Sequence, residues 1–434
     1  MHHLMRASRR TLLKVTSAAL AVGLPFAASA QQVEIKVGYM KNPIQDVSLD
    51  NMEKWAKANN VKLTRVPMAY SIFMEKVTAT LTTGADQFDI IWHNDDWGQL
   101  WKKWVEPTND IPGIENVDPW VLEAFINDDN KPTVVPIAPT VGTFFYRSDL
   151  LKPDEVPKTF DELVSVSQRL QKEGKVKWGF AGPMAMNNTW FTFWWTMWSN
   201  KCDIFKPLFE RDYEKLKANN FEPAIAEPCH QEIVEFWWDA IHKNKISPPG
   251  TPAYARNESN AIFMAGDAAF TLIDSVHWGE FNDPKRSRIA GKVAMAPFPV
   301  GPRAEKPTSW NEVWGWAIPI GVPAERKKVA KAMLSAWLAD EAGQKEMWEK
   351  TGGPPPNIKM WPKLRQDDKT FDMLMKAVFD NKPVAHSAYY FPEWPAVHKA
   401  YSDVMIQAVS GKREDIPQVL KDGVEKIRAA AKGN

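Results

Sequence analysis

Tryptophans beside carboxylate and amide side chains are the residues of this chain whose types and spacing favour ligand binding. The chain has 21 Trp against 8 Tyr, and two runs, Asn94-Asp95-Asp96 and Trp310-Asn311-Glu312, place polar acceptors next to tryptophan. An indole ring packs on the C–H face of a sugar ring. Carboxylates accept hydrogen bonds from its hydroxyls, and Asn both donates and accepts. These residues therefore predict a site for a sugar or a polyol.

A secreted carbohydrate-active enzyme is a second class that acidic residues allow. Glycosidases need two carboxyl groups roughly 5 to 10 Å apart. Asp95 and Asp96 are adjacent, so their side chains would diverge on an extended segment. The sequence also has no G-x-S-x-G motif. We therefore expect binding without catalysis.

Metal capture and cation binding are further classes. The histidines after the N-terminal segment have no H-x-H or H-E-x-x-H spacing, and the adjacent pair Cys229-His230 is a poor zinc signal. We therefore expect no metal and no cofactor. Trp with a carboxylate also makes a cation site, so an amino-acid-derived or polyamine ligand stays an open alternative.

Alternating strands and helices must position these groups. The hydrophobic periodicity predicts a parallel α/β sheet with helices on both faces, whose ligand lies at the carboxyl ends of the strands. The loops after the strands, 39–42 and 93–97, are therefore candidate ligand segments. The expected strands are 33–38, 61–66 and 88–92, and the expected helices are 49–59, 72–83, 97–104 and 325–338.

A later strand-like stretch, 134–146, contains Pro136 and Pro139 and predicts a hinge segment that crosses between two lobes. Thr140 lies on this segment. Thr159 and Glu162 have the spacing of a capping box at the start of a helix.

Residues 1–30 predict an export signal. An apolar run over 15–25, too short to span a bilayer, is followed by the small residues Ala28-Ser29-Ala30. The basic start, residues 8–14, resembles a twin-arginine signal, and an ordinary secretory signal is the alternative. No Cys follows the cleavage site, so a lipid anchor is not expected. The basic residues before the apolar run are Arg6, Arg9, Arg10 and Lys14.

The rest of the chain predicts a soluble protein of two lobes. Removing 30 of 434 residues leaves 404, more than one ordinary core. Removing four of the 54 basic side chains leaves 50 against 53 acidic ones, a balance that gives no sign of nucleic-acid binding. No later run of 18 apolar residues predicts a membrane span.

Cys202 and Cys229 are the two cysteines of the chain. In an oxidising periplasm they favour one structural disulfide, because they lack the C-x-x-C spacing of a reactive pair. Two unpaired thiols are the alternative.

Several passages, in order, resemble family 1 of the extracellular solute-binding proteins, the maltose-binding type of ABC importer receptor. Residues 157–163 (PKTFDEL) are similar to the family's "PKTWDEL" segment, and Glu312-Val313 replace its paired glycine, so the backbone freedom of glycine is lost there. The other matching passages are 131–150, 261–270, 292–299 and 314–319.

This resemblance implies an α/β fold of the type II periplasmic binding proteins, with two lobes, a hinge and a ligand cleft between the lobes. Lobe 1 would comprise 31–140 and 292–350, and lobe 2 would comprise 141–291 and 351–434. The implied function is capture of a small sugar or polyol in the periplasm by a monomer that serves an ABC permease of the inner membrane.

The resemblance also implies particular ligand-binding residues. Asp95 matches an acid that holds sugar hydroxyls in relatives, and Trp190 and Trp394 match stacking aromatics. Burial in the core is the alternative for each Trp, and a solvated loop or helix cap is the alternative for the smaller polar residues. The remaining candidates are Asp274, Trp278, Trp310, Asn311, Trp314, Asn94, Asp96, Trp92, Asn42, Asn188, His277 and Thr140.

Overall fold

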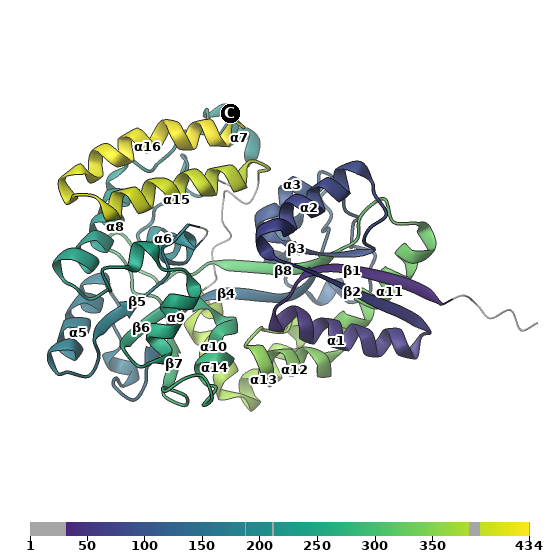
Figure 1. Ribbon diagram of the computed structural model, residues 1–434, viewed down its shortest axis with the longest axis horizontal. Coiled ribbons are helices and arrows are strands. Elements are labelled where there is room, and N and C mark those ends of the chain that lie inside the picture. The colour runs from purple at the N-terminus through teal and green to yellow at the C-terminus, as the bar shows by residue number, and fades with distance from the viewer. Residues whose placement is uncertain (1–31, 187, 211, 382–390, 434) are drawn as a thin grey trace, which may run out of the picture. The chain divides into compact units, whose positions relative to one another are not determined.

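Strands β4 and β8 lie side by side and join the other strands into one mixed sheet (Figure 1). The strand order is β2-β1-β3-β8-β4-β6-β5, and β7 also pairs with β4. The strands are β1 (Val33–Met40), β2 (Val61–Met68), β3 (Ile90–Asn94), β4 (Val135–Arg147), β5 (Trp178–Ala181), β6 (Ala268–Asp274), β7 (Val293–Ala296) and β8 (Asn311–Ala317).

The computed structural model describes residues 32–186, 188–210, 212–381 and 391–433. The expected export signal, 1–30, lies outside the described residues. Val33–Asn434 form one unit by their internal contacts, and the expected lobe boundaries stay a prediction. Along the described chain, no helix is both long enough and apolar enough to cross a bilayer.

The expectation of a parallel sheet is wrong for β4 and β8. β1 is parallel to β2 and β3, and β5 is parallel to β6. By contrast, β4 and β8 run antiparallel to each of their partners. A helix also lies between β4 and β5, and helices lie between β5 and β6, so the alternation of strand and helix continues beyond β3. β8 joins this sheet from more than 200 positions further along the chain, a pairing that local periodicity does not reveal.

β4 corresponds to the expected crossing segment, and it changes partners along its length. Residues 135–141 pair with β8, and residues 142–146 pair with β6. All 13 residues of the strand are buried. Pro136 lies at a register shift next to Ala138, where a strand tolerates a residue without an N–H. Its role as a hinge stays a prediction.

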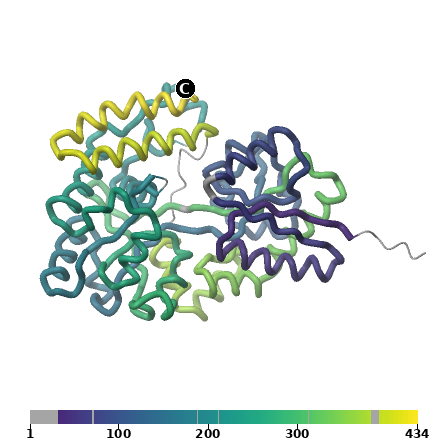
Figure 2. Tube along the Cα trace, viewed as in Figure 1, coloured from purple at the N-terminus to yellow at the C-terminus, as the bar shows by residue number. Residues whose placement is uncertain are grey.

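Helices surround the sheet, and α15 packs against α16 near the C-terminus (Figure 2). The helices are α1 (Pro43–Ala58), α2 (Tyr70–Thr83), α3 (Gly98–Trp101), α4 (Pro119–Leu122), α5 (Phe160–Lys172), α6 (Thr189–Trp198), α7 (Tyr213–Ala218), α8 (Pro228–Trp238), α9 (Arg256–Met264), α10 (Trp278–Phe281), α11 (Ala324–Ala339), α12 (Glu341–Thr351), α13 (Trp361–Asp367), α14 (Lys369–Ala377), α15 (Trp394–Ser410) and α16 (Ile416–Ala431).

Two local expectations need correction. The helix expected over 97–104 is a 3-10 turn, η1 (Asp95–Trp97), followed by the four residues of α3. At the start of α5, Thr159 accepts a hydrogen bond from the N–H of Glu162 as expected, at 3.1 Å. The carboxylate of Glu162 accepts instead from the N–H of Lys158, at 2.6 Å. Only half of the capping box therefore forms.

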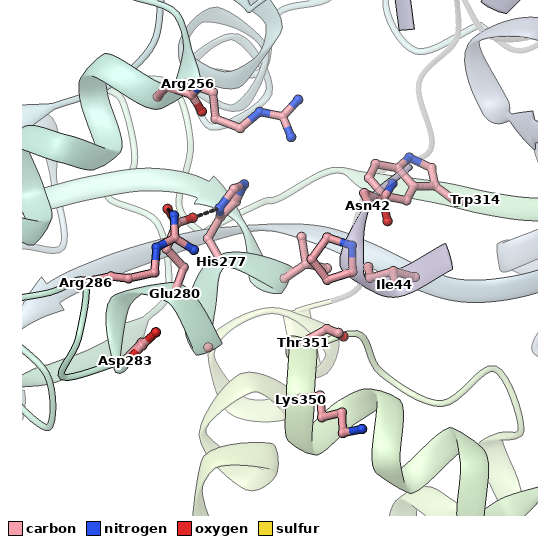
Figure 3. A pocket seen from close by; sticks show the side chains of 14 residues that line it. Asn42, Ile44, Arg256, His277, Glu280, Asp283, Arg286, Trp314, Lys350 and Thr351 are labelled. Carbon is pink, nitrogen blue, oxygen red and sulfur yellow. Dashed lines mark hydrogen bonds and ion pairs between the residues drawn. The ribbon is translucent and has the colours of Figure 1, made fainter. Parts of the chain in front are cut away.

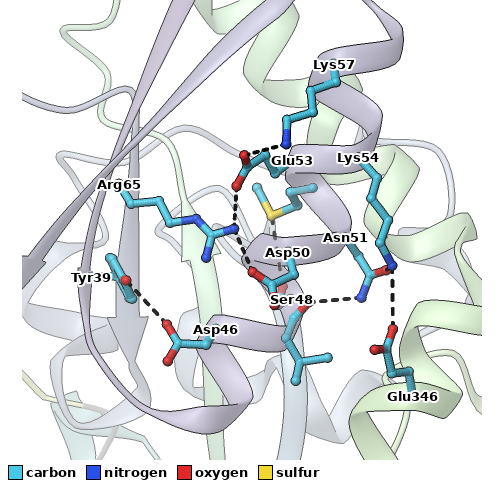
Figure 4. Close-up of polar contacts among 12 residues, drawn as sticks. Tyr39, Asp46, Ser48, Asp50, Asn51, Glu53, Lys54, Lys57, Arg65 and Glu346 are labelled. Atoms are coloured by element: carbon cyan, nitrogen blue, oxygen red, sulfur yellow. Dashed lines mark hydrogen bonds and ion pairs between the residues drawn. The ribbon is translucent and has the colours of Figure 1, made fainter.

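α1 packs against β1 and β2 through a buried face, and polar contacts surround this face (Figure 4). Nη2 of Arg65, on β2, lies 2.8 Å from Asp50 and 2.7 Å from Glu53. Tyr39, on β1, donates to Asp46 at 3.3 Å. Such partly exposed pairs contribute about 0–1 kcal/mol each. α1 therefore owes its place chiefly to its buried residues, and this place sets the N-terminus of α1 at the end of β1.

The loop after α6 is joined to α8 by a disulfide. Cys202 and Cys229 are bonded, with their Cα atoms 5.8 Å apart. Both cysteines are buried. His230, next to Cys229, is also fully buried and has a pKa lowered to about 4 because burial disfavours its charged form.

Candidate functional site

One face of the sheet brings together candidate residues from three strands. Residues directly opposite each other in paired strands point to the same face. Thr140 of β4 lies opposite Glu312 of β8, and Asp274 of β6 lies opposite Gly142, two positions after Thr140. Since side chains alternate along a strand, Trp314 shares the face of Glu312. We call Thr140, Asp274, Glu312 and Trp314 the acidic face.

The two acids that follow β3 are held by backbone N–H groups. Asn94 ends β3 and accepts from the N–H of Asp96 at 3.0 Å, so its side chain serves as a cap. Asp95 is 1% exposed. Its Oδ2 accepts from the N–H of Val313 at 3.0 Å, and its Oδ1 accepts from the N–H of Asp96 at 3.1 Å. Asp95 therefore ties η1 to β8, next to the acidic face.

Glu312 and Asp274 are buried carboxyl groups with open acceptor positions. Oε1 of Glu312 accepts from the indole N–H of Trp314 at 2.9 Å, whereas its Oε2 has no donor among the described residues. Both oxygens of Asp274 also lack a donor in the described part of the chain. The carboxyl group of Glu312 is the neighbour that interacts with the carboxyl group of Asp274. Thr140 donates to the backbone carbonyl of Glu312 at 2.7 Å, which holds β8 in place here.

Burial raises the pKa of each of these acids. The pKa of Asp274 rises to about 6, although the charge of Arg256 lowers it. Burial and then the charge of Glu312 raise the pKa of Asp96 to about 7. The pKa values of Asp95 and Glu312 are raised well above the ordinary range, by burial first and by neighbouring carboxylates second. These shifts favour the protonated forms of Asp95 and Glu312 near neutral pH.

Arg256 is the first residue of α9, and its positive charge lowers the pKa of Asp274 and of Glu312. Its guanidinium makes no hydrogen bond or ion pair with any described residue, and it lies 5.2 Å from the ring centroid of Phe191. Oδ1 of Asn188 accepts from the backbone N–H of Arg256 at 3.3 Å. Asn188 therefore helps to position Arg256, whose donors stay available.

A cavity of about 400 Å³ opens beside Arg256 (Figure 3). Asn42 and Trp314 lie on one side of it and His277 lies on the opposite side. Other residues that line it are Ile44, Glu280, Asp283, Arg286, Lys350 and Thr351.

Asn42 and His277, which line this cavity, each have one buried polar atom without a described partner. Asn42 caps α1 by accepting from the N–H of Gln45 at 3.1 Å, while its Nδ2 has no partner among the described residues. Nδ1 of His277 lies 2.8 Å from Glu280 and 3.1 Å from Asn260, and its Nε2 has no described partner. Burial lowers the pKa of His277, so the neutral ring is favoured.

Four of the candidate tryptophans form packed aromatic groups. The rings of Trp92 and Trp314 meet edge to face, with centroids 5.9 Å apart. Trp190 and Trp310 meet in the same manner at 5.7 Å. Trp92 and Trp310 are fully buried. Core packing therefore explains Trp92 and Trp310, whereas Trp314 lines the cavity.

Trp394 links α15 to the acidic residues after β3. Its indole N–H donates to Oδ1 of Asp96 at 2.9 Å. Its ring lies 5.3 Å from that of Trp194, centroid to centroid. Trp394 is fully buried, so it supports Asp96 in addition to any contact with a ligand.

Trp278 is not brought to the acidic face. Trp278, at the start of α10, packs on Phe145 of β4 with ring centroids 6.5 Å apart, and a Cβ on Gly352 would lie 3.1 Å from it. The neighbouring residue, His277, reaches the cavity instead. For Asn311, the described part is the backbone at the start of β8.

Sequence reasoning missed Arg256 and did not select Glu312 as a ligand residue. Glu312 had a signal, because it alternates with Trp310 and Trp314 along a strand. Arg256 had none, because it begins a short helix whose sequence has no ligand-binding pattern.

The described residues contain one group with metal-ligand spacing, Cys202, Cys229 and His230. Two of its three ligand atoms are joined in the disulfide, and a bridged sulfur is not the thiolate that a metal binds.

Comparisons with known proteins agree on one class of molecule. A model of the family described as bacterial extracellular solute-binding protein matches residues 51–371. A probable amino-acid ABC transporter periplasmic-binding protein of Sinorhizobium fredii is 24% identical over 358 residues, which cover 78% of this chain and 75% of that protein.

Solved structures are similar over nearly the whole chain. Maltose-bound MalE3 of T. maritima superposes with a TM-score of 0.76 at 22% identity, covering 91% of this chain and 99% of that chain. A solute-binding protein of Agrobacterium radiobacter K84, in complex with ribitol, has a TM-score of 0.74 at 19% identity, with 91% and 98% coverage. A third, from Agrobacterium vitis S4 with bound D-mannitol, has a TM-score of 0.72 at 20% identity, with 92% and 98% coverage.

Proposed function

The chain belongs to the family of bacterial extracellular solute-binding proteins, and from this premise we propose that it captures a small sugar or polyol in the periplasm for an ABC permease. As a solute-binding protein of an ABC transporter, it has the α/β fold expected from the sequence, that of the type II periplasmic binding proteins. The identity of the solute is the part that needs an argument from the site.

Complementary open groups around the acidic face are the observation that carries this proposal. Asp274 and Glu312 have carboxyl oxygens that accept from no described donor outside this pair, and the guanidinium of Arg256 makes no hydrogen bond or ion pair with a described residue. A hydroxyl both donates and accepts, so a polyol can satisfy both kinds of group at once. Trp314 lines the adjoining cavity and offers an indole for C–H groups.

The similar structures with bound maltose, ribitol and D-mannitol support the proposal as analogies of fold. The amino-acid type named for the Sinorhizobium relative supports the alternative of a ligand with a charged nitrogen. Both alternatives use the same site.

The proposed mechanism is binding without a reaction. The solute enters beside Arg256 and His277, and contacts from both sides of the cavity then favour the conformation that encloses it. A ligand shifts such an equilibrium only by its difference in affinity for the two conformations. The permease would then recognise the enclosed form.

A thermal-shift screen of residues 31–434 tests the proposal. Maltose, hexoses, ribitol, D-mannitol, amino acids and polyamines are compared, because a ligand of the folded state raises the midpoint by mass action. A shift with a sugar or polyol supports it. If only amino acids or polyamines raise the midpoint, the proposed sugar or polyol is wrong and the ligand is a cationic one. If no compound shifts the midpoint, mass spectrometry of the denatured protein looks for a retained solute, and finding one without hydroxyl groups would also reject the proposal.

A further inference from the structure

We propose that the captured solute carries a protonated amine beside its hydroxyl groups, and that Glu312 and Asp96 bind this ammonium group. The inference rests on the proposed function, because it names the solute class of the same site. It is argued from the excess of carboxyl groups, from their open oxygens and from the position of Arg256.

The carboxyl groups of Asp95, Asp96, Asp274 and Glu312 interact with one another, and Arg256 acts on two of them. Asp95, Asp274 and Glu312 are between 1% and 6% exposed. Glu312 acts electrostatically on Asp95 and Asp96, and Asp274 acts on Glu312. A buried carboxylate is stable when it is paired and must otherwise take up a proton. This excess of acid matches a solute that brings its own positive charge.

The open oxygens indicate where that charge would lie. Oε1 of Glu312 is occupied by the N–H of Trp314, and Oδ1 of Asp96 is occupied by the N–H of Trp394. Oε2 of Glu312 is buried and has no donor among the described residues. An ammonium group has three N–H donors. It can therefore bind Oε2 of Glu312 and the carboxylate of Asp96, while the indole rings beside them supply faces that attract cations.

Arg256 separates the two ends of the proposed solute. Its charge is the largest effect on the pKa of Asp274 after burial, whereas at Glu312 it comes after the effects of burial, Asp274 and Trp314. Arg256 would repel an ammonium group. We therefore place the amine on the side of Glu312 that faces Asp96, and Asp274 with Arg256 is left for hydroxyl groups.

Matched pairs of probes test this inference by isothermal titration of residues 31–434 at pH 7.5. Each neutral compound is compared with its amine, for example D-glucitol with 1-amino-1-deoxy-D-glucitol and D-glucose with D-glucosamine. We expect the amine to bind at least about tenfold more tightly, the range of a charge-assisted hydrogen bond. We also expect proton release, seen as a heat that depends on the ionisation enthalpy of the buffer, because the ammonium displaces protons from the acids.

The outcomes separate this inference from the function on which it rests. Equal or tighter binding of the neutral compounds overturns the inference and leaves the sugar or polyol receptor in place. Binding confined to amines without hydroxyls, such as putrescine, overturns both.

Three variants locate the ammonium group. Glu312→Gln and Asp96→Asn each keep the size of the side chain, and each is expected to reduce the preference for the amine at least about tenfold. Glu258→Gln is the matched control, because Glu258 lies on α9 with Arg256, is exposed and makes no ion pair with a described residue. Thermal unfolding confirms that each variant is folded. A preference that survives in both folded acid variants overturns the assignment.

Discussion

The indole N–H of Trp394 donates a hydrogen bond to Oδ1 of Asp96 across 298 positions of sequence, at 2.9 Å. This bond joins the first residue of α15 to the turn that follows β3. It lowers the pKa of Asp96, against the larger effects of burial and of Glu312. One hydrogen bond therefore links the C-terminal helices to the charge state of the site.

Trp394→Phe should destabilise the protein more at pH 8 than at pH 5.5. The variant keeps an aromatic ring and loses the N–H, so the ionised Asp96 loses a donor, at a cost of about 1–3 kcal/mol. At pH 5.5, below its pKa of about 7, Asp96 is protonated and the cost falls. Urea unfolding at the two pH values measures this difference. Trp238→Phe is the control, since the N–H of Trp238 donates to the carbonyl of Gly411 at 2.9 Å, and a pH-dependent loss there would contradict the explanation.

Asp274→Asn should become more stable relative to the wild type as pH rises from about 4 to about 6. Because the folded pKa of Asp274 is raised to about 6, the folded wild type holds a proton that the unfolded chain has already released. The stabilising effect of that proton is complete at low pH and is lost as pH rises through 6. The difference between the two proteins should change by about 3 kcal/mol. Urea unfolding from pH 4 to 8 measures it, with the exposed Asp161→Asn as a control that should show no such change.

Arg256→Gln should weaken binding of the best solute from the thermal-shift screen by at least about tenfold. It should leave the midpoint of the unliganded protein nearly unchanged, because the guanidinium makes no ion pair with a described residue. Calorimetric titration gives the affinity and differential scanning calorimetry gives the midpoint. Arg288→Gln, at an exposed position, is the matched loss of charge. Unchanged affinity in Arg256→Gln would remove Arg256 from the site.

Gly142→Ala should destabilise the fold by about 1–3 kcal/mol, the usual effect of overpacking. A Cβ at Gly142 would lie 2.5 Å from the ring of Trp310, which is fully buried and cannot move without disturbing its neighbours. Gly321→Ala is the control, because its nearest atom would be 3.4 Å away. Urea unfolding of both variants tests this, and equal stabilities would contradict it.

Reduction of the disulfide between Cys202 and Cys229 should lower the free energy of unfolding by roughly 3 kcal/mol. The two cysteines are 27 positions apart, and closing a loop of this length restricts the unfolded chain by about that amount. The double variant Cys202→Ala, Cys229→Ala should match the reduced wild type and should not respond to reductant. Titration of two free thiols in the native protein would contradict the bond.

Local patterns in the sequence were enough to identify the elements and several ligand candidates. The strands expected over 33–38, 61–66 and 88–92 overlap β1, β2 and β3, because apolar residues mark the buried positions of each strand. Asp95 and Asp96 were predictable as candidates because they follow β3, and ligands bind at the carboxyl ends of parallel strands.

Only the tertiary structure decided which groups meet. Asp274 and Glu312 contact each other because β4 pairs with β6 along one half and with β8 along the other. Arg256 reaches them from a helix whose sequence is ordinary, and Trp394 reaches Asp96 from the far end of the chain. Local periodicity shows which side of a strand is buried, but it does not show which other strand pairs with it. Long-range pairing depends on the path of the whole chain, and this path brings Asp274, Glu312 and Arg256 together.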